Sequence, residues 1–167
     1  MRVSILTVSD RSSRRERQDA SGPMLREMAE ARGWVVVATD IVPDEKLQIS
    51  SRLREWCDMD VTDLVLTTGG TGFATRDVTP EATRDVIERE APGLAEAMRA
   101  AAFPHNPHAM LSRGMAGIRG KTLVVNLPGS PKGAKEGLEV ISPALPHAIE
   151  LIRGNPGAES GHRHLPG

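Results

Sequence analysis

The first candidate for chemistry is a glycine-rich segment, Thr67-Thr68-Gly69-Gly70-Thr71-Gly72, here called the glycine loop. It follows Leu64-Val65-Leu66, an apolar run that predicts a buried strand. Glycines let the backbone turn sharply and approach a ligand closely, and the N–H groups of such a turn can form a concave site for phosphate. A plain tight turn explains the loop about equally well, because the sequence matches neither the Walker A pattern nor GxGxxG.

Arg76 and Asp77 lie just beyond the glycine loop and favour the phosphate interpretation. Thr79 is the predicted N-cap of a helix with Pro80 in its first turn, so the cap does not require Asp77. The Asp77 carboxylate therefore suits Mg²⁺ ligation or a role in a transition state. The Arg76 guanidinium could offset the charge of a bound phosphate.

Two further aspartates end predicted strands on the same edge of the sheet. Asp44 ends the second strand, and it either joins Asp77 in a Mg²⁺–nucleotide site or caps the next helix. The pattern alone does not decide between these roles. Asp10, which follows Ser9 at the end of the first strand, is more typical of a loop residue or a salt-bridge partner.

Two other segments offer groups to the same region. The turn Pro128-Gly129-Ser130 joins a strand to a helix that begins at Pro131, and Ser130 is its predicted N-cap. Ser112 and Arg113 could supply a hydroxyl and a guanidinium, although the pattern around them is not specific.

Strand-like and helix-like segments alternate, which predicts an α/β fold: a three-layer sandwich with a mostly parallel sheet and helices on both faces. The expected strands are residues 3–8, 35–42, 64–66 and 122–127, and the expected helices begin near residues 21, 45, 79, 92, 131 and 143. Ligands of such folds bind at the carboxyl ends of strands, where the strand order reverses. This rule gathers four loops into one site: residues 9–18, 43–45, 68–78 and 128–132. We expect one domain over residues 1–153 and a disordered tail over 154–167.

Composition excludes several classes of function. The 167 residues carry a net charge of −1 with few aromatic side chains, which argues against nucleic-acid binding. Cys57 is the only cysteine, so no internal disulfide forms. No apolar run approaches the roughly 18 residues of a membrane span, and no signal peptide is recognisable, so we expect a cytoplasmic protein with no membrane partner.

The chain also resembles a known family. The motifs Thr68-Gly69-Gly70-Thr71-Gly72-Phe73 and Arg76-Asp77-Val78-Thr79-Pro80 are similar to the signature of the molybdopterin adenylyltransferases. These are the MogA/MoaB-type proteins of molybdenum cofactor biosynthesis and the G domains of gephyrin and its plant counterpart. Further similar motifs occur in order along most of the chain: Val8-Ser9-Asp10-Arg11, Val42-Pro43-Asp44-Glu45, Met110-Leu111-Ser112-Arg113 and Asn126-Leu127-Pro128-Gly129-Ser130-Pro131.

The resemblance implies a homotrimer and a Mg²⁺-dependent reaction in which the terminal phosphate of molybdopterin attacks the α-phosphate of ATP. The products are adenylylated molybdopterin and pyrophosphate, and a molybdate-insertion protein receives the adenylylated pterin. The resemblance assigns the critical acidic positions to Asp44 and Asp77, which are also the candidate Mg²⁺ ligands. The candidate substrate and nucleotide residues are Ser9, Asp10, Thr68, Gly69, Gly70, Thr71, Gly72, Arg76, Ser112, Pro128, Gly129 and Ser130.

Two other functions stay open. A non-catalytic molybdopterin-binding or carrier protein of the MoaB type would use the same glycine loop, although the presence of both Asp44 and Asp77 favours the enzyme. A different nucleotide-using enzyme on this fold, such as the related domain of CinA-like proteins, normally belongs to a longer chain. The arginine-rich stretch 14–17 matches no family feature that we can assign.

Overall fold

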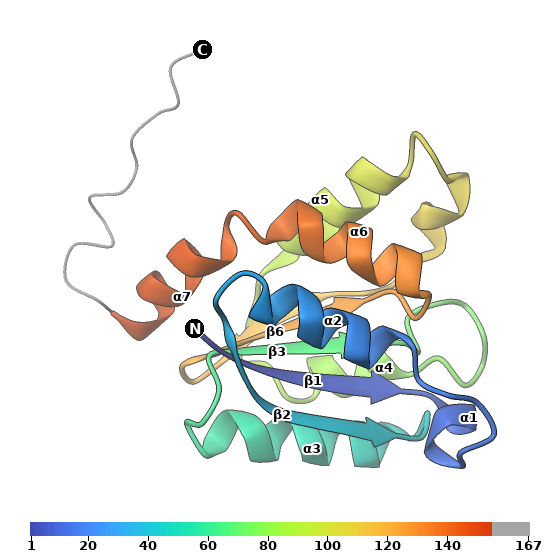
Figure 1. Ribbon diagram of the computed structural model, residues 1–167, viewed down its shortest axis with the longest axis horizontal. Coiled ribbons are helices and arrows are strands. Elements are labelled where there is room, and N and C mark those ends of the chain that lie inside the picture. Colours follow the sequence, from blue (N-terminus) through green and yellow to red (C-terminus); the bar gives the residue numbers. More distant parts are fainter. Residues whose placement is uncertain (155–167) are drawn as a thin grey trace.

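The computed structural model describes residues 1–154, and a six-stranded sheet forms their centre (Figure 1). The strand order is β2-β1-β3-β6-β5-β4. The strands are β1 (Arg2–Val8), β2 (Val35–Val42), β3 (Leu64–Thr68), β4 (Arg89–Glu90), β5 (Ala116–Arg119) and β6 (Thr122–Leu127). The neighbours from β2 to β6 pair in parallel, whereas β5 is antiparallel to β6 and β4 to β5. The prediction of a mostly parallel sheet is confirmed.

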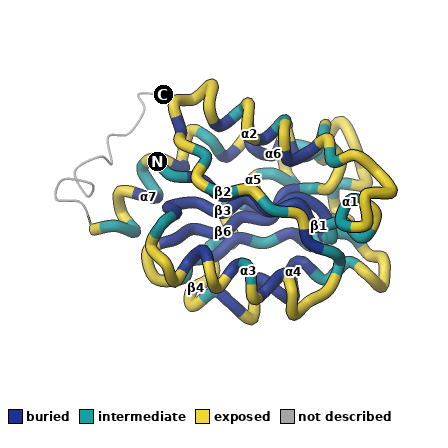
Figure 2. The backbone as a smooth tube through the Cα atoms, turned by 60° about the horizontal axis from the view of Figure 1, so that its bottom comes forward, coloured by how far each residue is buried: buried dark blue, intermediate teal, exposed yellow. Residues whose placement is uncertain are grey.

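Helices cover both faces of this sheet (Figure 2), which confirms the three-layer architecture. One face carries α2 (Ser21–Glu30), α5 (Pro92–Ala102), α6 (Pro131–Ile141) and α7 (Leu145–Arg153). The other carries α3 (Lys46–Asp58) and α4 (Thr79–Arg84). A short helix α1 (Asp10–Ser13) and a 3₁₀ helix η1 (Pro107–Leu111) lie in the connections. Within residues 1–154, no helix combines the length and apolar character needed to cross a membrane.

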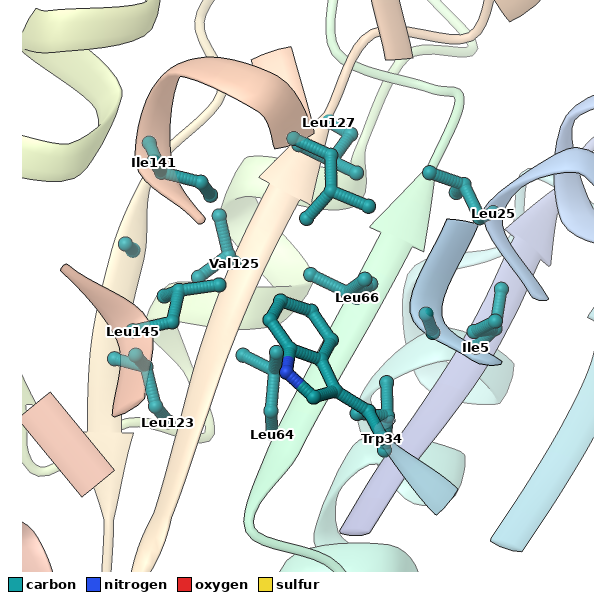
Figure 3. Packing of buried hydrophobic residues seen from close by; sticks show 14 of the residues in the cluster. Ile5, Leu25, Trp34, Leu64, Leu66, Leu123, Val125, Leu127, Ile141 and Leu145 are labelled. Atoms are coloured by element: carbon teal, nitrogen blue, oxygen red, sulfur yellow. The ribbon is translucent and has the colours of Figure 1, made fainter. Parts of the chain in front are cut away.

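The apolar residues of the central strands alternate between two cores, as the period-2 geometry of a strand requires. Leu64, Leu66 and Val125 pack beneath α2 and α6, where Trp34 also lies (Figure 3). Val65 belongs to the opposite core with the α3 face that the sequence predicts, namely Ile49, Leu53 and Trp56. This burial on both faces fixes the register of β3, and therefore the position at which the glycine loop begins.

The structure differs from the predicted elements in several places. Strand β5 and the helix η1 lie in a stretch for which the sequence predicts no regular structure, and α1 lies within a predicted loop. The last helix begins at Leu145 rather than Pro143. It ends at Arg153 and is capped by Gly154, which has a left-handed φ of 67°. The rest of the predicted disordered tail, residues 155–167, lies outside the described residues.

The strand order places a topological switch point at β1. The chain passes from β1 to β2 on one side, and β3 then pairs with the other side of β1. Connections that leave in opposite directions open a crevice at the carboxyl ends of such strands. Ser9 and the glycine loop follow these two strand ends directly.

Candidate functional site

The four loops predicted to form one site do meet at one edge of the sheet. The Ser9 N–H group donates to the Val42 carbonyl at 2.9 Å, which joins the ends of β1 and β2. The Thr68 hydroxyl donates to the Pro128 carbonyl at 2.7 Å, which joins the ends of β3 and β6. The sheet topology therefore brings together segments that are more than 100 residues apart in the chain, such as Ser21 and Gly129, whose hydroxyl and carbonyl hydrogen-bond at 3.1 Å.

Asp44 does not cap the following helix, so the capping alternative is wrong. Helix α3 begins at Lys46, and its N-cap position, Glu45, makes no side-chain cap hydrogen bond. Instead, Asp44 Oδ2 accepts the N–H of Asp10 at 2.7 Å, and Asp10 Oδ1 accepts the N–H of Asp44 at 3.1 Å. Each carboxylate thus fixes the backbone of the other across the ends of β1 and β2.

Arg76 reaches these two loops from the far side of the glycine loop. Its Nε and Nη2 donate to the two carboxylate oxygens of Asp10 at 3.0 and 2.8 Å, and Nη1 donates to Glu45 at 2.8 Å. The hydrogen bonds from Arg76 lower the pKa of Asp10. The Arg76 guanidinium is ion-paired with the carboxylates of both Asp10 and Glu45. Arg76 therefore holds the two loops together and is not free to bind a phosphate.

Asp44 lies in a different electrostatic environment. Burial raises its pKa, the hydrogen bond from the Asp10 N–H opposes that shift, and the negative charges of Asp10 and Asp77 add to it. A half-buried carboxylate with two anionic neighbours would be stabilised by a cation placed beside it.

The glycine loop passes directly between Asp44 and Asp77. A methyl group on Gly70 would lie 2.4 Å from Thr79 Oγ1 and 3.0 Å from Asp44 Oδ1, and Gly70 also has a positive φ of 63°. A methyl group on Gly72 would lie 2.8 Å from Asp77 Oδ2. Glycine is required here because both carboxylates pack against the backbone itself.

Thr79 and Asp77 hold the segment that follows the loop. Thr79 is not the N-cap of α4, because that position is Val78 and the buried Thr79 hydroxyl donates to the Gly69 carbonyl at 2.8 Å. The Asp77 Oδ2 atom accepts the N–H of Ala74 at 3.0 Å. The predicted cap was wrong because Thr79 is already the first residue of the helix, and its hydroxyl donates to the glycine loop instead of accepting an N–H of the first turn.

Four consecutive N–H groups at the turn are open. Across residues 1–154, no hydrogen-bond acceptor is paired with the N–H of Gly70, Thr71, Gly72 or Phe73. Adjacent unpaired N–H groups carry partial positive charge, and an anionic ligand can satisfy them. This arrangement favours a phosphate site over a plain tight turn.

A cavity of about 1000 Å³ adjoins the loop. Its lining includes eight of the predicted residues: Gly70, Thr71, Gly72, Asp77, Ser112, Pro128, Gly129 and Ser130. The other six predicted residues, Ser9, Asp10, Asp44, Thr68, Gly69 and Arg76, do not line it. The Ser9 and Ser130 hydroxyl oxygens accept N–H groups as the N-caps of α1 and α6, which confirms the predicted cap at Ser130.

The opposite wall of the cavity comes from α5 and α6, which the sequence does not connect with the site. Met98 and Arg99 of α5 and Gly137 of α6 line this wall. The sequence pattern of α5 marks Met98 only as a packing residue. His105 and His108 also line the cavity near its η1 end, so they adjoin the site although the described residues form no metal cluster there.

The acidic groups present suit a magnesium ion that shares its ligands with a substrate. Among residues 1–154, no group of three or more His, Cys, Asp or Glu side chains could enclose a metal. Mg²⁺ usually binds through one or two carboxylates together with substrate phosphates and water. Asp44 and Asp77, on either side of the open N–H groups, fit that requirement.

The chain is similar to known proteins along most of its length. Residues 4–147 match a family model described as "Probable molybdopterin binding domain". The molybdopterin adenylyltransferase of Helicobacter pylori strain J99 is 43% identical, covering 92% of this chain and 88% of the relative. The molybdenum cofactor synthesis protein cinnamon of Drosophila melanogaster is 48% identical over 89% of this chain, which spans only 25% of that longer protein.

A solved structure has the same fold. The molybdopterin biosynthesis enzyme MoaB from Thermus thermophilus superposes with a TM-score of 0.87 at 54% identity, covering 93% of this chain and 98% of that one. Family model, sequence relatives and structure agree, and the chain therefore belongs to the MogA/MoaB family of molybdopterin-binding proteins of molybdenum cofactor biosynthesis.

Proposed function

We propose that this protein is a molybdopterin adenylyltransferase, which transfers AMP from ATP to the terminal phosphate of molybdopterin and releases pyrophosphate. The observation that carries the proposal is the run of open N–H groups from Gly70 to Phe73 between the carboxylates of Asp44 and Asp77. The adenylyltransferase name of the Helicobacter relative supports the same reaction.

The reaction joins two anions, so the site must align phosphates and offset their charge. An oxygen of the pterin phosphate forms a bond to the α-phosphorus of ATP, and the bond from that phosphorus to the bridging oxygen of the β-phosphate breaks. The attacking oxygen is already anionic, so no general base is required. The loop N–H groups supply fixed dipoles without adding net charge.

The chain's own residues bind the two substrates, position the loops and would hold the metal ion. The cavity beside Ser112 and Pro128 takes the pterin, and the ATP phosphates lie over the glycine loop. The Asp10–Asp44 hydrogen bonds and the Arg76 ion pairs hold the β1 and β2 loops in place before substrate arrives. Asp44 and Asp77 would hold Mg²⁺, which when bound neutralises phosphate charge and polarises the α-phosphorus.

An omission assay tests the proposal. Purified protein is mixed with ATP, Mg²⁺ and molybdopterin, and pyrophosphate release is followed, with each component left out in turn. We expect release only when all are present. Tight pterin binding without pyrophosphate release would instead support a non-catalytic carrier of the MoaB type and would reject the enzyme.

Assembly and handover are part of the proposal. We infer a homotrimer in the cytoplasm that passes adenylylated molybdopterin to a molybdate-insertion protein, and the family resemblance alone supports these points. Light scattering tests the assembly: a mass near three times the 18.0 kDa chain is expected, and a monomer would reject it.

A further inference from the structure

Arg113 donates three hydrogen bonds to the loop between the glycines and α4. Its backbone N–H donates to the Thr71 carbonyl at 2.8 Å. Its Nε donates to the Gly72 carbonyl at 2.8 Å, and Nη2 donates to the Asp77 carbonyl at 2.6 Å. One half-buried residue therefore binds three carbonyl groups along residues 71–77.

These three hydrogen bonds set the direction of the peptide planes. In a trans peptide, the carbonyl and the next N–H point in opposite directions. When Arg113 binds the carbonyls of Thr71 and Gly72, the N–H groups of Gly72 and Phe73 must point away from it. These are two of the four open N–H groups of the site.

The positive charge of Arg113 is matched by a neighbour. Its guanidinium forms an ion pair with Glu81 in the first turn of α4. The pair is close to neutral as a unit, so Arg113 adds little net attraction for an anion. What it supplies is geometry, because the planar guanidinium presents donors in fixed directions that a lysine cannot reproduce.

A second arginine, Arg99, hydrogen-bonds to the backbone on both sides of Arg113. Arg99 of α5 donates through Nη1 to the carbonyls of Gly114 at 2.8 Å and Ser112 at 3.4 Å, on either side of Arg113. Arg99 and Ser112 both line the cavity. A continuous series of hydrogen bonds thus runs from the cavity wall, through residues 112–114, to the loop that carries Asp77.

We propose that Arg113 is the positioning residue of this site: it orients the N–H groups of Gly72 and Phe73 toward a substrate phosphate and fixes the backbone of Asp77. The identity of that phosphate rests on the proposed function. The orientation of the loop does not, because it is argued from hydrogen bonds within the protein.

The test compares Arg113→Lys and Arg113→Met with a matched control, Arg119→Met. Arg119 is also half-buried, pairs with Asp58 and donates to the Val86 carbonyl, but it lies at the opposite edge of the sheet. Amide exchange by NMR is followed at Ala74 and Asp77, whose N–H groups hydrogen-bond within the loop. We expect exchange at both to rise about tenfold in the Arg113 variants, because the loop loses the side-chain hydrogen bonds that hold it, and to stay unchanged in Arg119→Met.

Turnover gives the second measurement. A misplacement of about 1 Å can cost about 100-fold in rate, so we expect kcat of both Arg113 variants to fall about 100-fold while KM for molybdopterin changes little. Glu81→Gln removes the charge but leaves the carbonyl contacts, and kcat should stay near that of the wild type. The proposal would be overturned if the amide exchange rates of Ala74 and Asp77 were the same in Arg113→Met as in the wild type. It would also be overturned if these rates rose equally in Arg119→Met.

The two proposals can fail separately. If the wild type forms no adenylylated pterin, the enzyme proposal is wrong, but the exchange measurement still decides whether Arg113 orders the loop. If the wild type turns over and Arg113→Lys has normal kcat and normal exchange, only the role of Arg113 is wrong.

Discussion

Asp10 and Asp44 each accept the backbone N–H of the other, at 2.7 Å for Asp44 Oδ2 and 3.1 Å for Asp10 Oδ1. This reciprocal pair locks the ends of β1 and β2 and leaves Asp44 Oδ1 facing Gly70. An aspartate that caps a helix would direct its carboxylate toward that helix. The pair instead directs Asp44 toward the glycine loop, where Asp77 lies on the other side.

The first prediction concerns these two carboxylates. Asp44→Asn and Asp77→Asn should each retain pterin binding and lose at least about 100-fold in kcat. Charge stabilisation by a metal is worth several kcal/mol, and each ~1.4 kcal/mol corresponds to tenfold in rate. The measurement is molybdopterin affinity by fluorescence titration beside steady-state turnover.

Asp58→Asn is the matched control, because Asp58 is an ion-paired aspartate at the end of α3, remote from the loop. Its turnover should equal that of the wild type. Near-normal kcat in Asp77→Asn would remove Asp77 from the proposed chemistry, whatever the result for Asp44.

The second prediction concerns Gly70. Gly70→Ala should lower the free energy of unfolding by about 1–2 kcal/mol, the cost of a left-handed backbone for a residue with a Cβ. The added methyl group would also displace Thr79 from the Gly69 carbonyl and press on Asp44, so turnover should fall. Urea unfolding and kcat are measured on the same preparation.

Gly93→Ala provides the comparison in α5, because a methyl group there would have no neighbour within 4 Å beyond the adjacent residues and the backbone of its own helix. Stability and turnover should both be unchanged or slightly improved. If Gly70→Ala behaved like Gly93→Ala, the close approach of Asp44 and Thr79 to the backbone of Gly70 would be incorrect.

Much of the fold follows from local patterns in the sequence. The continuous apolar runs of β3 and β6 reflect strands buried on both faces, and Ile49, Leu53 and Trp56 mark the buried face of a helix. The alternation of such strands with helices predicts the three-layer sandwich. The meeting of the four loops also follows, because parallel strands end at the same edge. By contrast, β5 is only four residues long and forms a tight hairpin with β6, and the turn signal at Gly120, which has a positive φ of 53°, was not recognised in the sequence.

The site was less predictable than the fold for a related reason. The roles of Asp44 and Thr79 depend on hydrogen-bond partners 34 and 10 residues earlier in the chain, and a local capping rule does not include them. Arg113 hydrogen-bonds to a loop about 40 residues earlier in the chain, and the α5–α6 wall forms only when the sheet has assembled. The family resemblance assigned roles to Asp44 and Asp77, but it assigned none to Arg113 or to the α5–α6 wall.

The third prediction concerns stability at the other end of the sheet. The nearly buried Asp63 accepts hydrogen bonds from the Arg2 backbone at 2.6 Å and from Arg2 Nη2 at 3.0 Å, and it also pairs with Arg153. Burial opposes ionisation, but the contacts with Arg2 and Arg153 prevail and the pKa of Asp63 is lowered. Asp63→Asn should therefore cost about 1–3 kcal/mol at neutral pH.

The sign of the pH dependence follows from that lowered pKa. The stabilisation from Asp63 is fully present above its unfolded pKa of about 3.9 and is lost as pH falls through the lower folded value. Urea unfolding at pH 7 and at pH 3 should show the difference between wild type and Asp63→Asn shrinking in acid. A constant difference between these two pH values would contradict the ionised Asp63.

Transfer of AMP from ATP to molybdopterin at this site can be followed directly with a label on the α-phosphate of ATP. The protein is mixed in excess with α-³²P-labelled ATP, Mg²⁺ and molybdopterin, and the quenched products are separated. We expect label in the pterin fraction, in a 1:1 ratio with pyrophosphate, and almost none with Asp77→Asn. Intact labelled ATP beside a fully pterin-loaded wild-type protein would contradict it.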